Sequence, residues 1–180
     1  MPVDDFTMTS GEVVRRVFGE IASDPGAVYL QGIRSGRVKE DSSHGQYYRG
    51  MLPFLPSKLV WQLKAETPSY DAVVSAPSSR ADTGPYLNAV LAASEAKDLS
   101  SRFKRLGKYK ARDPDVTLDD MIEEFIYTPA GDEPEFKSLV IVDESSSTGK
   151  TFAAMLVHLR LAGLSEDCKI TVAVWAKLGK

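Results

Sequence analysis

Hydrophobic residues along this chain of 180 residues fall into two recurring patterns. Residues 139–142 are four consecutive apolar residues, a pattern typical of a strand buried on both faces in a parallel sheet. Residues 72–76 and 169–175 are also strand-like. Strands that alternate with helices predict an α/β fold whose mainly parallel, twisted sheet is flanked by helices. Apolar residues at helical spacing predict those helices over residues 9–22, 57–66, 85–98, 117–127 and from 152 to about Gly163.

The candidate chemistry lies where the predicted 139–142 strand ends. Asp143 and Glu144 follow that strand directly, and small hydroxyl residues, a glycine and a predicted helix come next. The backbone N–H groups of such a turn, together with the helix N-terminus, suit a phosphate group. Two carboxylates would repel the same phosphate, so we expect them to bind what lies beside it, such as sugar hydroxyls or a divalent cation.

Residues 143–151 read D-E-S-S-S-T-G-K-T, which resembles the phosphoribosyl pyrophosphate (PRPP) motif of type I phosphoribosyltransferases. That motif has an apolar strand, two adjacent acids, three variable residues and then T-G-x-T. The resemblance implies that Asp143 and Glu144 are catalytic residues that bind the ribose 2′ and 3′ hydroxyls. The second acid is Glu where the family more often has Asp, which changes its reach. The residues implied for the 5′-phosphate are Ser145, Ser146, Ser147, Thr148, Gly149, Lys150 and Thr151.

Two other interpretations of this stretch stay open. S-T-G-K-T is also the tail of the nucleotide-triphosphate P-loop, G-x-x-x-x-G-K-[ST]. The first glycine of that pattern would fall at position 144, which is Glu, and only about thirty residues follow the motif. A carboxylate there would repel phosphates, so the P-loop is disfavoured. An ordinary strand–helix turn without a ligand is the other alternative.

A second strand, turn and helix precede the motif by some sixty residues. The predicted strand at 72–76 runs into a turn of small polar residues and then Arg80. In the family an equivalent loop holds pyrophosphate, and the resemblance implies that role for Pro77, Ser78, Ser79 and Arg80. A proline–serine turn of no function is the alternative. If the two strands are neighbours in the sheet, both anion sites face one crevice at the carboxyl ends of the strands.

Residues 100–112 contain six Lys and Arg and no acid. In the family a mobile loop in this part of the chain closes over PRPP, and the basic side chains would meet the pyrophosphate charge. The candidates for that role are Arg102, Lys104, Arg105, Lys108 and Lys110. Contact with nucleic acid is a second interpretation, because Phe103 and Tyr109 interleave with the cations. A solvated helix face is the third.

The resemblance covers about residues 70–176, so we expect a phosphoribosyltransferase core over 70–180 and a helical cap over 1–69, together forming one compact domain. Residues 32–56 are rich in glycine and include Tyr47 and Tyr48; they suit either a cap that stacks on a base or a surface loop. In the 117–127 helix, which Thr117 would cap, we expect a solvated acidic face. The acids on that face are Asp119, Asp120, Glu123 and Glu124.

Composition narrows the class of protein. The net charge of −3 gives no strong field favouring nucleic acid. No apolar run approaches the ~20 residues that span a bilayer, and the acidic N-terminus lacks a signal peptide's apolar core, which predicts a cytoplasmic protein. Cys168 is the only cysteine, so there is no disulfide framework; we expect it to be structural. His158 is expected to pack or lie at the surface.

The resemblance as a whole implies a glycosyltransferase of nucleotide metabolism. It would bind PRPP and Mg²⁺, transfer phosphoribose to an unidentified acceptor, and release pyrophosphate. Mg²⁺ would be held mainly through PRPP, with Asp143 and Glu144 as further ligands. The layout is nearest to the competence-protein F-like branch, without the zinc module that often precedes it. A regulator that binds PRPP or nucleotides without turnover, a component of a nucleic-acid-associated assembly, and a homodimer all remain open.

Overall fold

The computed structural model describes residues 3–7, 13–18, 46, 50, 52–77, 84–111, 113–146 and 148–177. Its centre is a six-stranded sheet in the order β1-β2-β8-β7-β3-β4. Within this sheet β1 is antiparallel to β2, and the other neighbouring pairs are parallel. The prediction of an α/β fold with a mainly parallel sheet is therefore confirmed. The strands are β1 Val3–Thr7, β2 Val13–Phe18, β3 Ala72–Ser75, β4 Lys97–Asp98, β7 Ser138–Ser146 and β8 Lys169–Lys177.

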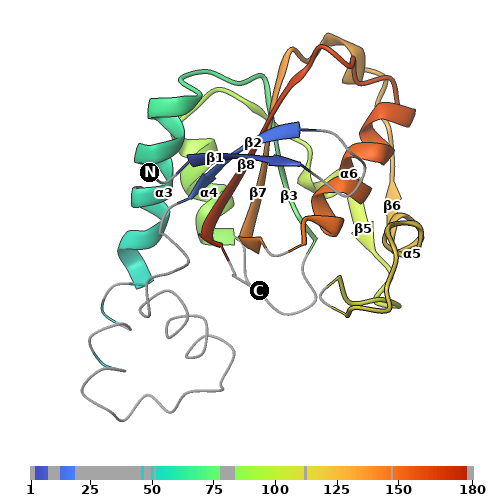
Figure 1. Ribbon diagram of the computed structural model, residues 1–180. Coiled ribbons are helices and arrows are strands. Elements are labelled where there is room, and N and C mark those ends of the chain that lie inside the picture. Colours follow the sequence, from blue (N-terminus) through green and yellow to red (C-terminus); the bar gives the residue numbers. More distant parts are fainter. Residues whose placement is uncertain are drawn as a thin grey trace.

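Helices cover both faces of this sheet (Figure 1). On one face lie α3 Leu55–Glu66, preceded by the 3₁₀ turn η1 Leu52–Phe54, and α4 Gly84–Ala92. On the other lie α5 Leu118–Glu123 and α6 Lys150–Leu161. Strand β7 separates two apolar cores, because Leu139 and Ile141 pack on the α6 side whereas alternate residues pack on the α3 side. This burial on both faces confirms the interpretation of the unbroken apolar run.

A second, two-stranded sheet lies beside α6. It pairs β5 Phe103–Arg105 antiparallel with β6 Phe125–Tyr127. The Phe103 ring lies 4.5 Å from the Tyr127 ring and 6.2 Å, edge-on, from His158 of α6. His158 Nε2 also lies 3.0 Å from the carbonyl oxygen of Ile122. His158 is therefore a packing residue, as predicted. Two further 3₁₀ turns, η2 Ser100–Arg102 and η3 Glu133–Glu135, lie close to this two-stranded sheet.

Three of the predicted helices exist with different limits. The 57–66 helix begins earlier, at Leu55, with a proline in its first turn. The 85–98 helix ends at Ala92, and Lys97–Asp98 forms β4 instead. Thr117 caps α5 in a reciprocal pair with Asp120, as predicted, but the helix ends at Glu123. The aromatic and β-branched residues that follow form β6, because they can pair with β5.

The predicted helix at 9–22 is wrong for residues 13–18, which form β2. Valines are favoured in strands, and β2 gains two partners, pairing with β1 and β8. Arg16 is 3% exposed in this strand, and its guanidinium makes two hydrogen bonds to Asp4 of β1, at 2.9 and 2.8 Å. Most of the 32–56 region lies outside the described residues. None of the described helices is both long and apolar enough to cross a membrane.

Candidate functional site

The two strands that carry the predicted anion sites are neighbours. Strand β3 pairs parallel with β7, with Ser75 opposite Val142, and Ala76 N donates to the Val142 carbonyl at 2.8 Å. Parallel neighbours end at the same edge of a sheet, so the segments after β3 and β7 start side by side. The arrowheads of β7 and β8 point to this edge (Figure 1). We call this end, formed by residues 75–77, 143–146 and 148–149, the carboxyl edge.

Strand β7 is longer than the motif suggests. Asp143 is half-buried and lies opposite Val174, and the pairing with β8 continues through Ser145 and Ser146. The expected phosphate turn at 145–151 therefore begins inside the strand and ends inside α6. Glu144 also lies in β7, and Ser147 is outside the described residues. The turn between strand and helix is consequently shorter than the resemblance implies.

Gly149 shapes the start of α6. It is the residue before the helix and has φ 73° and ψ 2°, in the left-handed region that glycine adopts without steric cost. In the described structure no side chain caps this end in the usual way; Thr148 Oγ1 is only a distant acceptor, 3.5 Å from Lys150 N. Thr151 is half-buried in the first turn of α6. A helix that starts without a side-chain cap leaves N–H groups for an anion.

Lys150 serves a different purpose from the lysine of a P-loop. Its ammonium donates to the carbonyl oxygens of Val116 and, at 3.2 Å, Asp113. These carbonyls belong to the turn that leads into α5. In a P-loop the lysine reaches the β- and γ-phosphates. The position of this ammonium gives the P-loop interpretation no support.

Of the predicted pyrophosphate residues, only Pro77 is described; Ser78, Ser79 and Arg80 lie outside the described residues. Pro77 is half-buried at the carboxyl edge. Its carbonyl oxygen is 3.5 Å from Arg105 Nη1, and just before it Ser75 N donates to Ser100 Oγ at 2.8 Å. Residues 75–77, which lead into the predicted pyrophosphate turn, are therefore in contact with Ser100 and Arg105.

Arg102, a candidate for the mobile loop, is engaged elsewhere. It hydrogen-bonds both oxygens of Asp132, at 2.6 and 3.1 Å, and Glu133 at 2.8 Å. These contacts raise the pKa of Arg102 and lower that of Asp132. Burial alone would raise the pKa of Glu133, but the Tyr127 hydroxyl and backbone N–H groups lower it to about 2. We assign Arg102 to this structural network, which fixes the 128–136 segment.

Arg105 is held by Glu124, which the sequence had suggested to be solvated. That prediction is wrong, because Glu124 is 0% exposed. Its carboxylate accepts from Arg105 Nε at 2.7 Å and from the backbone N–H groups of Gly107, Lys108 and Tyr109 at 2.7–2.9 Å. Burial raises the pKa of Glu124, but these four donors outweigh it and hold the pKa below its usual value. The basic segment therefore contains a turn bound to an internal carboxylate.

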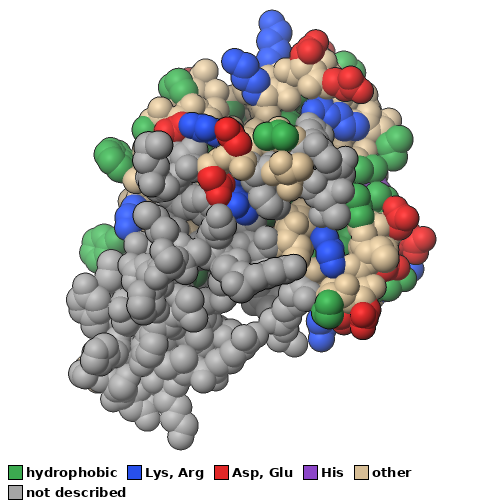
Figure 2. All heavy atoms as spheres, in the orientation of Figure 1, with side chains coloured by type: hydrophobic (Ala, Val, Ile, Leu, Met, Phe, Trp, Pro, Cys, Tyr) green, Lys and Arg blue, Asp and Glu red, His purple; other side chains and the backbone are tan. Residues whose placement is uncertain are grey.

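The remaining cations and aromatics of residues 100–112 bear on the other two interpretations of this segment, contact with nucleic acid and a solvated helix face. Lys104, Lys108 and Lys110 are exposed, whereas Phe103 is buried against other rings and Tyr109 is half-buried against the core. Phe103 therefore offers no face to a nucleic-acid base. A solvated helix is wrong here, because the segment forms η2 and β5. Acidic and basic side chains are also interspersed over the visible described surface (Figure 2), without a large basic field.

The described residues of the carboxyl edge include one carboxylate that could contact a metal ion, that of Asp143. Among the described residues, no three His, Cys, Asp or Glu side chains are grouped so as to hold an ion. Mg²⁺ needs less than this, because it commonly takes one or two carboxylates together with phosphate oxygens and water. The half-buried carboxylate of Asp143 fits that donor set.

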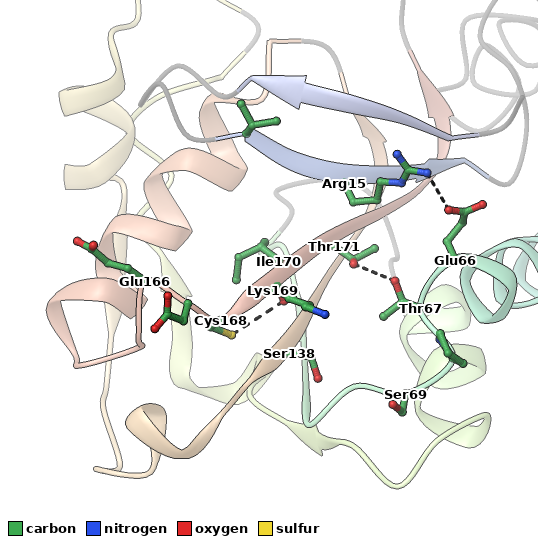
Figure 3. Close-up of a pocket in the computed structure, with 13 residues that line it drawn as sticks. Arg15, Glu66, Thr67, Ser69, Ser138, Glu166, Cys168, Lys169, Ile170 and Thr171 are labelled. Atoms are coloured by element: carbon green, nitrogen blue, oxygen red, sulfur yellow. Dashed lines mark hydrogen bonds and ion pairs between the residues drawn. The ribbon is translucent and has the colours of Figure 1, made fainter.

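A separate pocket of about 690 Å³ lies at the opposite edge, where β7 and β8 begin. Figure 3 shows Arg15 extended toward Glu66, 2.9 Å away, and the hydroxyls of Thr67 and Thr171 3.0 Å apart. Cys168, the single cysteine of the sequence, is buried in its wall. Among the described residues, none that the sequence singled out for PRPP lines this pocket.

No protein-family model matches this chain, and neither does any curated protein. The motif and its position in the fold are therefore the features that bear on function.

Glu124 was the main residue that sequence reasoning missed. It lies three positions after the buried Met121, so it falls on the inner side of the 117–127 helical spacing. Its inward position in the helical pattern did not predict burial, because Glu is almost never fully buried unless it is paired. Its partner Arg105 lies 19 residues earlier and is not apparent from the local pattern.

Proposed function

We propose that this protein is a phosphoribosyltransferase of the type I fold, which binds PRPP and Mg²⁺ at the carboxyl edge. It transfers phosphoribose to an acceptor and releases pyrophosphate. The observation that carries the proposal is the parallel pairing of β3 with β7, which brings the acid-bearing motif and the start of the second turn to one edge. Two separate anion sites with a sugar between them is the layout that PRPP requires.

The proposed roles follow the order of groups along PRPP. The turn at Gly149 and the N-terminus of α6 hold the 5′-phosphate through backbone N–H groups. Asp143 and Glu144 accept hydrogen bonds from the ribose hydroxyls. The segment that starts at Pro77, with Lys104 and Lys108 from the basic segment, faces the pyrophosphate. When bound, Mg²⁺ supplies positive charge to the pyrophosphate oxygens.

Chemically, the bond between C1 of the ribose and the pyrophosphate oxygen breaks, and its electron pair leaves with pyrophosphate. The acceptor's lone pair forms the new bond to C1. Positive charge develops on the sugar in the transition state, and a nearby carboxylate such as Asp143 stabilises it more than it stabilises the neutral ground state. No protein nucleophile is needed.

A thermal-unfolding screen tests the ligand. The wild-type protein is measured with PRPP and Mg²⁺, ribose 5-phosphate, AMP and ATP. A ligand present at 100 times its Kd stabilises the folded state by about 2.7 kcal/mol, so PRPP binding would be visible as a raised Tm. Failure of PRPP with Mg²⁺ to stabilise the protein at millimolar concentration would refute the proposal. Release of pyrophosphate with a panel of bases then separates an enzyme from a binding protein.

Replacing one acid tests the site. Asp143→Asn should weaken PRPP affinity about tenfold to hundredfold, because hydrogen bonds to a charged group contribute about 1.5–3 kcal/mol. Asp119→Asn, on an exposed acid of α5, is the matched control and should leave the affinity unchanged. Equal affinities of both variants and the wild type, measured by calorimetry, would remove Asp143 from the site.

A further inference from the structure

Arg105 joins three separate segments of the protein. Its Nε donates to Glu124 at 2.7 Å, its Nη2 to the Tyr109 carbonyl at 2.7 Å, and its Nη1 reaches the Pro77 carbonyl at 3.5 Å. Its side chain is 16% exposed, so the guanidinium lies mostly within the protein. Three of its five N–H donors are thus directed at acceptors in three places. These are Glu124 just before β6, Tyr109 in the basic segment and Pro77 just after β3.

Glu124 fixes the same basic turn. In addition to the Arg105 guanidinium, its carboxylate accepts from three consecutive backbone N–H groups, those of residues 107–109. Gly107 has φ 82°, a conformation that favours glycine and lets these N–H groups converge. One carboxylate therefore orients the guanidinium and shapes the turn that presents the exposed Lys108.

The end of β3 receives a second contact from this segment. Ser75 N donates to Ser100 Oγ at 2.8 Å, two residues before Pro77. Ala76 N, between these two positions, donates to Val142 of β7. The segment 100–109 and strand β7 thus hold the last residues of β3 from two sides.

We propose that Arg105 is a positioning residue, which sets the end of β3 against the basic turn 106–109 so that both meet the pyrophosphate group of the ligand. This inference rests on the proposed function. It replaces the direct contact with pyrophosphate that the sequence suggested for Arg105. A lysine cannot replace Arg105 in this role, because its ammonium is a compact point charge and cannot reach all three separated acceptors as the planar guanidinium does.

The experiment compares Arg105→Lys with Arg102→Lys. Both arginines are mostly buried, both are paired with a fully buried glutamate, and both lie in or directly before β5, but only Arg105 reaches Pro77. Calorimetry with Mg²⁺ gives the Kd for PRPP, inorganic pyrophosphate and ribose 5-phosphate, well below each variant's Tm. We expect Arg105→Lys to weaken PRPP and pyrophosphate about tenfold or more and to change ribose 5-phosphate less than twofold. Arg102→Lys should leave all three within twofold.

A general loss of structure would lower all three affinities together, and that result would overturn the positioning role. The same holds if Arg102→Lys reproduces the Arg105→Lys pattern, or if Arg105→Lys binds PRPP as the wild type does. If Arg105→Lys does not fold, Ser100→Ala removes the other contact to β3 and should weaken PRPP and pyrophosphate by a few fold, with ribose 5-phosphate unchanged. Unchanged binding by Ser100→Ala would then count against the proposal. Wild-type protein that binds none of the three ligands would instead refute the proposed function itself.

Discussion

Glu124→Gln is the substitution with the most sharply defined cost. The change keeps the size of the side chain and removes its charge. In the wild type, Oε1 accepts from Arg105 Nε and Gly107 N, and Oε2 accepts from Lys108 N and Tyr109 N. Whichever oxygen becomes an NH₂ group, two donors lose their acceptor and face another donor instead.

The magnitude follows from that count. A donor that loses its acceptor at this buried carboxylate costs about 1–3 kcal/mol, so two of them cost about 2–6 kcal/mol. Breaking a buried ion pair by removing one partner gives a similar range, about 3–5 kcal/mol. We therefore expect Glu124→Gln to lower the free energy of unfolding by about 3–5 kcal/mol. That is a large part of the 5–15 kcal/mol typical of a domain.

Urea unfolding followed by circular dichroism at neutral pH measures the effect. Glu123→Gln is the matched control, since Glu123 is the preceding carboxylate, is exposed, and should change stability by less than about 0.5 kcal/mol. A loss below 1 kcal/mol for Glu124→Gln, or equal losses for the two variants, would show that Glu124 does not organise the turn at residues 107–109 and its contact with Arg105.

Two further predictions concern acid stability and Lys150. The pKa of Glu133 is about 2 in the folded protein against 4.5 in the unfolded chain, so its contribution is complete above pH 4.5 and is lost as the pH falls toward 2. Asp132, whose pKa is also lowered, acts in the same direction; a free energy of unfolding that stays constant down to pH 3 would contradict both. Lys150→Met should cost about 1–2 kcal/mol in urea unfolding, because it removes the donor to the Val116 and Asp113 carbonyls. The same variant should keep PRPP affinity within about twofold; a hundredfold loss would revive the P-loop interpretation.

Local patterns were enough to predict the central part of the fold. The unbroken apolar run of β7 predicted a strand buried on both faces, which the two cores confirm. The cap at Thr117 was predictable because its partner, Asp120, lies only three residues later. Gly163, predicted as the end of the motif helix, has φ 100° directly after α6, where a Cβ would also come within 3.2 Å of Pro134. In each case the deciding interaction lies within a few residues or follows from composition.

The parts that could not be predicted depend on partners distant in the sequence. The valines of β2 are compatible with a helix or a strand, and the choice is made by β1 and by β8, which lies more than 150 residues later. Glu124 can be buried because Arg105, 19 residues earlier, donates to its carboxylate. For the site, the two motifs were visible in the sequence. Their adjacency was not, because strand order is a property of the whole sheet.

The placement of β2 redefines the smallest part of the chain that can stand alone. Residues 70–180 look self-sufficient from their motifs, yet β8 pairs with β2 along Arg15–Phe18. Removing the first 69 residues would leave that border of β8 bare, together with the apolar surface now under α3. The unpaired N–H and C=O groups of an exposed strand can pair with strands of other chains, so we expect the shortened protein to aggregate.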